Sequence, residues 1–306
     1  MDSQTIYDQV STHYSAASQG TTTGYGSAIA KSFGYSEDEL ASAPEGSNLG
    51  LSCGNPLAMA SISEGETVID LGSGAGFDSF LAANRVGRSG KVIGVDMNKD
   101  MLAKANKIKT ETGKTNVEFL ESGITNMSAL QSSIADCIIS NCVINLVPAT
   151  EKHLVFGEIF RLLKPGGRLA ISDILAKKAM PEKLRSDMAM YVGCISGASM
   201  VGEYEKFLKD AGFEEILITD TKSDLNVYLQ TNEDGFKKAD GYSPTKVDKE
   251  EEENCCEPSS EICCTPKSSS PCCATNCCAP ESNYVSLTES DLNEWAGSFK
   301  VYAVKN

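Results

Sequence analysis

The amino-acid sequence predicts an α/β fold in which a mostly parallel sheet carries helices on both faces. Apolar segments typical of buried strands alternate with amphipathic helical segments along most of the chain. The first of these strands, 68–71, contains Asp70 near its end and is followed by three glycines at alternate positions. A helix then begins at about Phe77. This arrangement is typical of the first strand-to-helix turn of a doubly wound sheet, where such folds bind nucleotides.

The hydrophobic periodicity predicts the other elements in order. Strands are expected at 91–96, 117–121, 136–141, 168–175 and 215–219. Helices are expected at 4–18, from about Ser36, and at 77–86, 99–112, 151–163, 180–191 and 201–211. A short helix that holds Trp295 and an alternating strand at 298–305 would complete a seven-stranded sheet.

Two early segments are predicted to be loops. Residues 19–26 are rich in threonine and glycine, and residues 44–56 contain three glycines and two prolines. Cys53 lies in the second of these loops, close in sequence to the glycine turn. A cysteine in such a place is a candidate functional thiol, and the alternative is a half-buried loop cysteine without a role.

Composition excludes several classes of protein. The net charge is −15 and no cluster of lysine and arginine is present, so nucleic-acid binding is not expected. No apolar span reaches membrane length, so no membrane association is expected. The first ten residues carry Asp2 and Asp8 and lack the pattern of a secretory signal. We therefore expect a cytoplasmic location.

Twelve cysteines are present, and in a reducing compartment they favour metal, metalloid or redox chemistry over structural disulfides. Four are scattered through the first two thirds of the chain: Cys53, Cys137, Cys142 and Cys194. Eight form adjacent pairs at 255/256, 263/264, 272/273 and 277/278. These pairs either capture a thiophilic metalloid or belong to a low-complexity segment without a specific role, and the sequence does not separate the two.

The spacing of the glycine turn favours one nucleotide. The pattern Asp70-x-Gly72-x-Gly74-x-Gly76, with Ser73 inside it, resembles the S-adenosylmethionine (SAM) loop of class I methyltransferases and differs from a dinucleotide fingerprint. Asp96 ends the next strand, where a carboxylate can accept hydrogen bonds from both ribose hydroxyls. The residue after it, Met97, would lie over the adenine or belong to the core. Asn141 is expected at the carboxyl edge of the sheet, where ligands bind in this fold class.

Several motifs together resemble the arsenite methyltransferases. They are residues 47–56, 68–77, 94–97, 139–146 and 163–167. The resemblance implies that Cys53, Cys142 and Cys194 hold trivalent arsenic as three thiolates, which suits a soft and thiophilic element. It also implies that the arsenic lone pair takes the methyl group of SAM, with arsenite and methylarsenite as substrates. Cys137 has no role in the family and is expected to be a buried structural residue.

The sequence departs from the family pattern at two places. The family regenerates trivalent arsenic by forming a protein disulfide, which thioredoxin or glutathione then reduces. Because no cysteine precedes Cys53, three routes stay open: a disulfide among the three site cysteines, use of a later cysteine, or reduction by external thiols alone. Relatives also often have an acid near the adenine where this chain has Gly123, so that only backbone groups at Gly123 and Ile124 could serve there.

Composition, hydrophobic periodicity and the resemblance together predict four segments. They are an N-terminal helical cap over the active site (1–45), a SAM-dependent methyltransferase domain (46–230), a disordered cysteine-rich insert (231–282) and a final helix and strand (283–306). The expected function is arsenite methylation. Two alternatives are another small-molecule C-methyltransferase, which would need an acid or base beside an apolar pocket, and a metalloid-sequestering protein on a methyltransferase fold.

Overall fold

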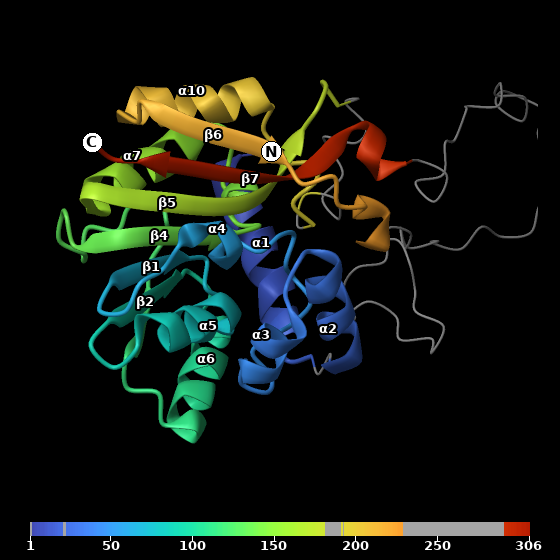
Figure 1. Cartoon of the computed structure of the whole chain (residues 1–306). Helices are drawn as coiled ribbons and strands as arrows, with labels where there is room; N and C mark the ends of the chain where they lie inside the picture. The colour runs from blue at the N-terminus through green and yellow to red at the C-terminus, as the bar shows by residue number, and fades with distance from the viewer. Residues whose placement is uncertain (1, 21–22, 181–190, 192, 229–290) are drawn as a thin grey trace, which may run out of the picture. The chain divides into compact units, whose positions relative to one another are not determined.

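A computed structural model describes residues 2–20, 23–180, 191, 193–228 and 291–306 (Figure 1). Seven strands form one sheet in the order β3-β2-β1-β4-β5-β7-β6. Strands β1 to β5 are parallel, whereas β7 lies between β5 and β6 and is antiparallel to both. The strands are β1 (Thr67–Leu71), β2 (Lys91–Asp96), β3 (Val117–Glu121), β4 (Ala135–Asn141), β5 (Leu163–Ala176), β6 (Glu215–Asp220) and β7 (Ala296–Val304). The predicted fold class, a mostly parallel seven-stranded sheet, is confirmed.

Helices pack on both faces of this sheet because successive strand side chains point to opposite faces. Val68 of β1 packs in one apolar cluster with α4, α5 and Ile108 of α6, and Ile69 packs in another with α7 and α10. The α-helices are α1 (Ser3–Ser18), α2 (Thr23–Ser32), α3 (Glu37–Ser42), α4 (Leu57–Ala60), α5 (Phe77–Val86), α6 (Lys99–Thr112), α7 (Lys152–Leu162) and α10 (Val201–Ala211). Short 3-10 helices are η1 (Ile144–Leu146), η2 (Leu225–Tyr228) and η5 (Leu292–Glu294).

Most predicted elements agree with the structure to within two residues, but three differ. Residues 19–26 were expected to be a loop, and this is wrong in part because α2 begins at Thr23. The burial of Ile29 and Ala30 outweighs the low helix propensity of the two glycines in α2. Strand β5 begins at Leu163 and not at Arg168. The expected helix near Trp295 is only the 3-10 turn η5.

Two predicted segments fall largely or wholly outside the described residues. They are the helix expected at 180–191 and the cysteine-rich insert at 231–282, which contains all eight paired cysteines. Within the described ranges, no helix is both long and apolar enough to span a bilayer.

The chain leaves the described residues after Tyr228 and returns at Asp291, and hydrogen bonds join the two sides of this gap. Asn226 Nδ2 donates to Asp291 Oδ1 at 2.9 Å, and the Leu292 N–H donates to Asn226 Oδ1 at 3.1 Å. The Tyr228 hydroxyl donates to the Ser52 carbonyl at 2.8 Å. The residues just before β7 are therefore held next to η2 by hydrogen bonds.

Helix α1 is held against the carboxyl ends of the strands by three polar side chains. Asn98 Nδ2 donates to the Ser11 carbonyl at 2.9 Å, and Lys104 Nζ donates to the Ser18 carbonyl at 2.8 Å. Near the start of the helix, the Tyr7 hydroxyl donates to Glu151 Oε2 at 2.8 Å. These contacts make α1 one wall of the site described next.

Candidate active site

A cavity of about 380 Å³ lies at the carboxyl edge of β1, β2 and β4. Nine residues that the sequence predicts to bind a cofactor line it: Asp70, Gly72, Ser73, Gly74, Asp96, Met97, Gly123, Ile124 and Asn141. The tenth, Gly76, does not line the cavity. A Cβ atom there would come within 2.8 Å of the rings of Phe80 and Phe119, so Gly76 allows the turn to pack against these rings.

The turn after β1 requires glycine for a steric reason. Gly72 has φ 67°, and a Cβ atom there would overlap the side chain of Val143. Gly74 also has positive φ, but its nearest neighbour would be Met101 Sδ at 3.9 Å. Gly72 is therefore needed for packing against the segment after β4, whereas Gly74 leaves space beside the cavity.

The cavity is acidic. Asp70, Asp78, Asp96 and Glu151 line it, and none of the described residues that line it is a lysine, arginine or histidine. Asp70 Oδ2 accepts a hydrogen bond from Ser79 Oγ at 2.6 Å, and burial raises the pKa of Asp70 well above its usual value. Asp96 accepts hydrogen bonds from the Gly74 and Asn98 N–H groups at 2.9 and 2.8 Å. Such a lining favours a positively charged ligand.

Asp78, in the first turn of α5, was not predicted from the sequence. Its carboxylate accepts hydrogen bonds from the Tyr35 hydroxyl at 2.6 Å and from Asn141 Nδ2 at 2.9 Å. Burial raises its pKa to about 6. An acid at the start of a helix is usually explained by the helix dipole, so the sequence offered no signal for a place in the cavity.

Asn141 connects this cavity to the loop of Cys53. Its Nδ2 donates to the Tyr35 hydroxyl, the Gly54 carbonyl and Asp78 Oδ2, each at 2.9 Å. Its Oδ1 accepts a hydrogen bond from the Cys53 N–H at 3.2 Å and lies 3.7 Å from the Cys53 sulfur. The Asn141 carboxamide is thus engaged by the protein itself, although the residue lines the cavity.

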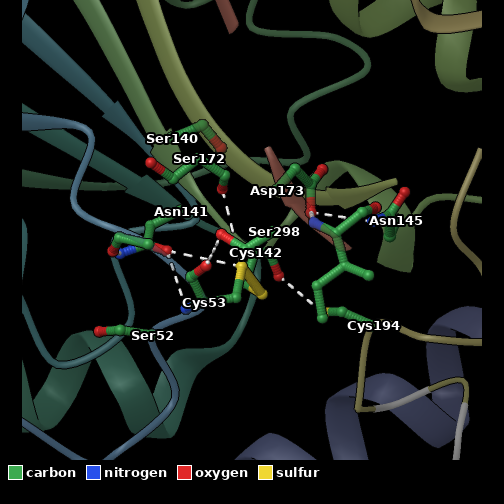
Figure 2. The surroundings of a disulfide bond; sticks show 12 residues. Ser52, Cys53, Ser140, Asn141, Cys142, Asn145, Ser172, Asp173, Cys194 and Ser298 are labelled. Carbon is green, nitrogen blue, oxygen red and sulfur yellow. Dashed lines mark hydrogen bonds between the residues drawn. A yellow bond between two sulfur atoms is a disulfide. The ribbon is translucent and has the colours of Figure 1, made fainter. Parts of the chain in front are cut away.

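Cys53 and Cys142 form a disulfide, with Cα atoms 5.7 Å apart (Figure 2). Cys53 lies in the loop before α4 and is completely buried, whereas Cys142 follows β4 and lines the cavity. The structure therefore contains a disulfide between two of the three predicted site cysteines, which is the bond that the first of the three redox routes would require. In this state neither sulfur atom can act as a thiolate ligand.

Cys194 lies beside this disulfide as a free, buried thiol. Its Sγ donates a hydrogen bond to the Cys142 carbonyl at 2.8 Å. Burial raises the pKa of the Cys194 thiol, the nearby Asp173 raises it further, and a hydrogen bond from Tyr14 of α1 opposes both effects. The structure thus brings all three predicted thiols to one region, but Cys194 does not line the cavity.

Asp173 is a buried acid of the site that was not predicted from the sequence. One of its carboxylate oxygens and the sulfur atoms of Cys53 and Cys142 all lie within 4.8 Å of one another. Burial raises the pKa of Asp173 to about 7, and the charge of Lys152 opposes this increase. The available signal was an acid inside an apolar segment, near the carboxyl end of a strand.

Cys137 lies apart from this region. It is a buried, free thiol on β4 that packs with Val68 and Ile139 on the face covered by α5. Burial raises its pKa to about 12, so the thiolate is strongly disfavoured. This setting is that of a core residue.

Comparisons with known proteins find methyltransferases, with arsenite methyltransferases among the most similar relatives. A family model described as a methyltransferase domain matches residues 62–212. An arsenite methyltransferase of Halobacterium salinarum is 46% identical over 185 residues, which are 60% of this chain and 46% of the relative. The arsenite methyltransferase of Aquipseudomonas alcaligenes is 39% identical over 178 residues, or 56% of this chain and 50% of the relative.

A solved structure extends this similarity. The crystal structure of an arsenic(III) S-adenosylmethionine methyltransferase from Chlamydomonas reinhardtii matches with 30% identity and a TM-score of 0.51, covering 67% of this chain and 69% of that one. The chain spans half the length or less of the curated arsenite methyltransferases that it matches. The similarity in sequence and in fold leads to one conclusion: the chain belongs to the arsenite methyltransferase family.

Proposed function

We propose that this protein transfers the methyl group of SAM to trivalent arsenic bound by its cysteines. The observation that carries the proposal is the position of Cys142, which lines the same cavity as Asp70, Asp96 and the glycine turn. An acceptor bound to the Cys142 sulfur would therefore be held beside the cofactor. Placement of the two reactants at contact distance is the main contribution a protein makes to a transfer of this kind.

The cavity residues fit SAM. The cofactor carries a positive sulfonium and an ammonium group, and the described residues that line the cavity include four carboxylates and no basic side chain. The Ser73 hydroxyl is buried at the glycine turn and has no hydrogen-bond partner among the described residues, so it can bind a polar group of the cofactor. Met97 and Ile124 offer an apolar surface for the adenine. When bound, SAM supplies an electrophilic methyl group.

The three thiols fit arsenic as the acceptor. Trivalent arsenic prefers sulfur ligands, and its lone pair needs no general base because it carries no proton. Arsenite and methylarsenite are the proposed substrates. The lone pair attacks the methyl carbon, the bond between that carbon and the sulfonium sulfur breaks, and arsenic is formally oxidised by two electrons.

The disulfide gives a route for returning those two electrons. If the thiolates of Cys53 and Cys142 give up two electrons and form their disulfide, arsenic returns to the trivalent state. An external dithiol or two molecules of a monothiol, such as thioredoxin or glutathione, would then reduce the disulfide. Such a cycle requires a reducing compartment, for which the cytoplasm is the natural candidate.

The test is product analysis with full-length protein, SAM, arsenite and a thiol reductant. We expect methylated arsenicals from the wild type and a loss of at least about 100-fold in rate for Cys142→Ser, because the site then lacks a sulfur ligand. Cys137→Ser is the matched control and keeps the wild-type rate, since Cys137 lies in the core outside the site. No methylated product from the wild type, or full activity of Cys142→Ser, would contradict the proposal.

A further inference from the structure

The disulfide has an acidic neighbour that arsenic chemistry does not require. The sulfur atoms of Cys53 and Cys142 and a carboxylate oxygen of Asp173 lie within 4.8 Å of one another, and Figure 2 places Asp173 beside the sulfur pair. All three residues are buried, with exposed fractions of 0%, 5% and 0%. They come from three separate segments: the loop before α4, the turn after β4, and β5.

The hydrogen bonds to the Asp173 carboxylate only partly offset the burial of its negative charge. Its Oδ1 accepts hydrogen bonds from Asn145 Nδ2 at 2.9 Å and from the Ile174 N–H at 3.0 Å. Among the described residues, Oδ2 accepts only a long bond of 3.3 Å, from the Tyr204 hydroxyl. All of these donors are neutral. None of the salt bridges among the described residues includes Asp173, and a buried carboxylate without a cation is unfavourable.

The positive charge that acts on Asp173 is that of Lys152, which is connected to it through Asn145. Lys152 Nζ donates to Asn145 Oδ1 at 3.3 Å, to Ser199 Oγ at 3.0 Å and to the Gly197 carbonyl. Asn145 therefore stands between Lys152 and Asp173, and Oδ2 of Asp173 keeps a lone pair for another ligand.

We propose that reduction of the disulfide turns Cys53, Cys142 and Asp173 into a binding site for a divalent thiophilic cation such as Zn²⁺. Thiolate and carboxylate are both ordinary zinc ligands, and three protein ligands leave a fourth position for water. The site shares two cysteines with the proposed arsenic site, but zinc binding does not depend on methyl transfer.

The geometry requires only small movements. Zinc binds sulfur at about 2.3 Å and carboxylate oxygen at about 2.0–2.2 Å, so tetrahedral ligand atoms lie roughly 3.5–3.8 Å apart. Breaking the disulfide lets the two sulfur atoms separate to this spacing. The Asp173 oxygen already lies within 4.8 Å of both, so rotation of the side chains is enough.

The charges and electrons balance. Reduction of the disulfide takes two electrons and two protons from a dithiol or a phosphine with water, and zinc binding then releases the two thiol protons. Two thiolates and one carboxylate carry three negative charges against two on the cation. The positive charge of Lys152, which acts on Asp173, offsets the remaining one.

Zinc and arsenic would differ in their third ligand at this site. Trivalent arsenic needs a third sulfur, which Cys194 supplies, and gains little from a carboxylate oxygen. Zinc accepts the oxygen of Asp173. Loss of this carboxylate should therefore weaken zinc binding and leave arsenite binding in place.

The experiment measures protection of individual cysteines in the reduced full-length protein. Because eight further cysteines lie in the insert, total metal content is uninformative, and alkylation is followed by mass spectrometry of the peptides that contain Cys53, Cys142 and Cys194. We expect excess Zn²⁺ to slow alkylation of Cys53 and Cys142 by at least about tenfold and that of Cys194 by much less. Asp173→Asn should lose most of this zinc protection while arsenite still protects all three cysteines.

Two further variants make the result decisive. Asp70→Asn neutralises another buried acid of the site and should keep zinc protection of Cys53 and Cys142. Asp173→Cys supplies a sulfur ligand and should restore the protection, even if Asp173→Asn folds poorly. Unchanged zinc protection in Asp173→Asn, or equal protection of Cys194 in the wild type, would overturn the proposal. Loss of arsenite protection in the wild type would instead count against the proposed methyltransferase function.

Discussion

The side chain of Asn141 holds the loop that carries Cys53. Its Oδ1 accepts a hydrogen bond from the Cys53 N–H at 3.2 Å, and its Nδ2 donates to the next carbonyl, that of Gly54, at 2.9 Å. Asn141 directly precedes Cys142 in sequence, so one residue fixes the backbone positions of both members of the disulfide. The distance between the two sulfur positions therefore depends on β4.

Replacement of Asn141 by alanine is predicted to reduce the rate of methylation more than the affinity for the cofactor. The Cys53 loop loses the two main-chain hydrogen bonds that Asn141 makes with it, and a displacement of about 1 Å can reduce a rate about 100-fold. Steady-state kinetics with arsenite and calorimetric titration with S-adenosylhomocysteine check this. A loss of affinity as large as the loss of rate would show that Asn141 acts mainly on the cofactor.

Gly72→Ala is predicted to destabilise the protein and abolish cofactor binding. The residue has positive φ, and its new Cβ would overlap Val143, so both strain and overpacking of about 1–3 kcal/mol apply. Gly113→Ala is the matched control, because Gly113 has φ 63° but no atom within 4 Å of its Cβ position. Thermal unfolding should show a clearly larger decrease in Tm for Gly72→Ala, and equal decreases would refute the packing argument.

Asn98 is predicted to have two separable roles. Its Oδ1 caps α6 by accepting from the Met101 N–H at 3.0 Å, and its Nδ2 donates to Ser11 of α1. Asn98→Asp keeps the cap and removes the donor, whereas Asn98→Ala removes both and costs about 1 kcal/mol more. Hydrogen exchange should detect faster exchange in α1 for both variants. The helix α6 should loosen only in Asn98→Ala, and an unchanged α1 in Asn98→Asp would contradict this division.

Reduction of the disulfide is predicted to lower the stability of the fold. The bond joins residues that are 89 positions apart, and closure of a loop of this size removes up to about 4–5 kcal/mol of chain entropy from the unfolded state. Differential scanning calorimetry with and without a phosphine reductant measures the change. In a Cys53→Ser, Cys142→Ser double variant, the reductant should have no further effect on the transition of the sheet.

The stability of the oxidised protein is predicted to fall as the pH rises from about 4 to about 7, through the contribution of Asp173. The unfolded chain ionises this acid near pH 3.9, whereas burial raises its folded pKa to about 7. Within this window the folded state binds more protons, so its free energy of unfolding decreases with increasing pH. Asp173→Asn should show a flatter dependence in urea denaturation, by about 1–4 kcal/mol across the window. Parallel curves for the two proteins would exclude this contribution.

The sequence allows the sheet and the cofactor cavity to be predicted because both follow from local patterns. Alternation of strands with amphipathic helices and the glycine spacing after Asp70 are visible within short windows. The Cys53–Cys142 pairing cannot be predicted from such local patterns, because nothing in a separation of 89 residues selects it over pairing with Cys194. Asp173 and Lys152 were missed for a similar reason. Asp173 is a single acid in an apolar segment, Lys152 lies between Glu151 and His153 at the start of a helix, and only the fold brings them to the region of the sulfur atoms.

The hydrogen bonds between η2 and the start of η5 hold together the two described chain positions on either side of residues 229–290. Asn226 bonds to both Asp291 and Leu292, so the sheet receives β7 from the same place whatever the length of the chain between them. The entropy of closing such a loop grows only slowly with its length. A change in the number of residues between these two positions should therefore cost little free energy and leave the entry of β7 into the sheet unchanged.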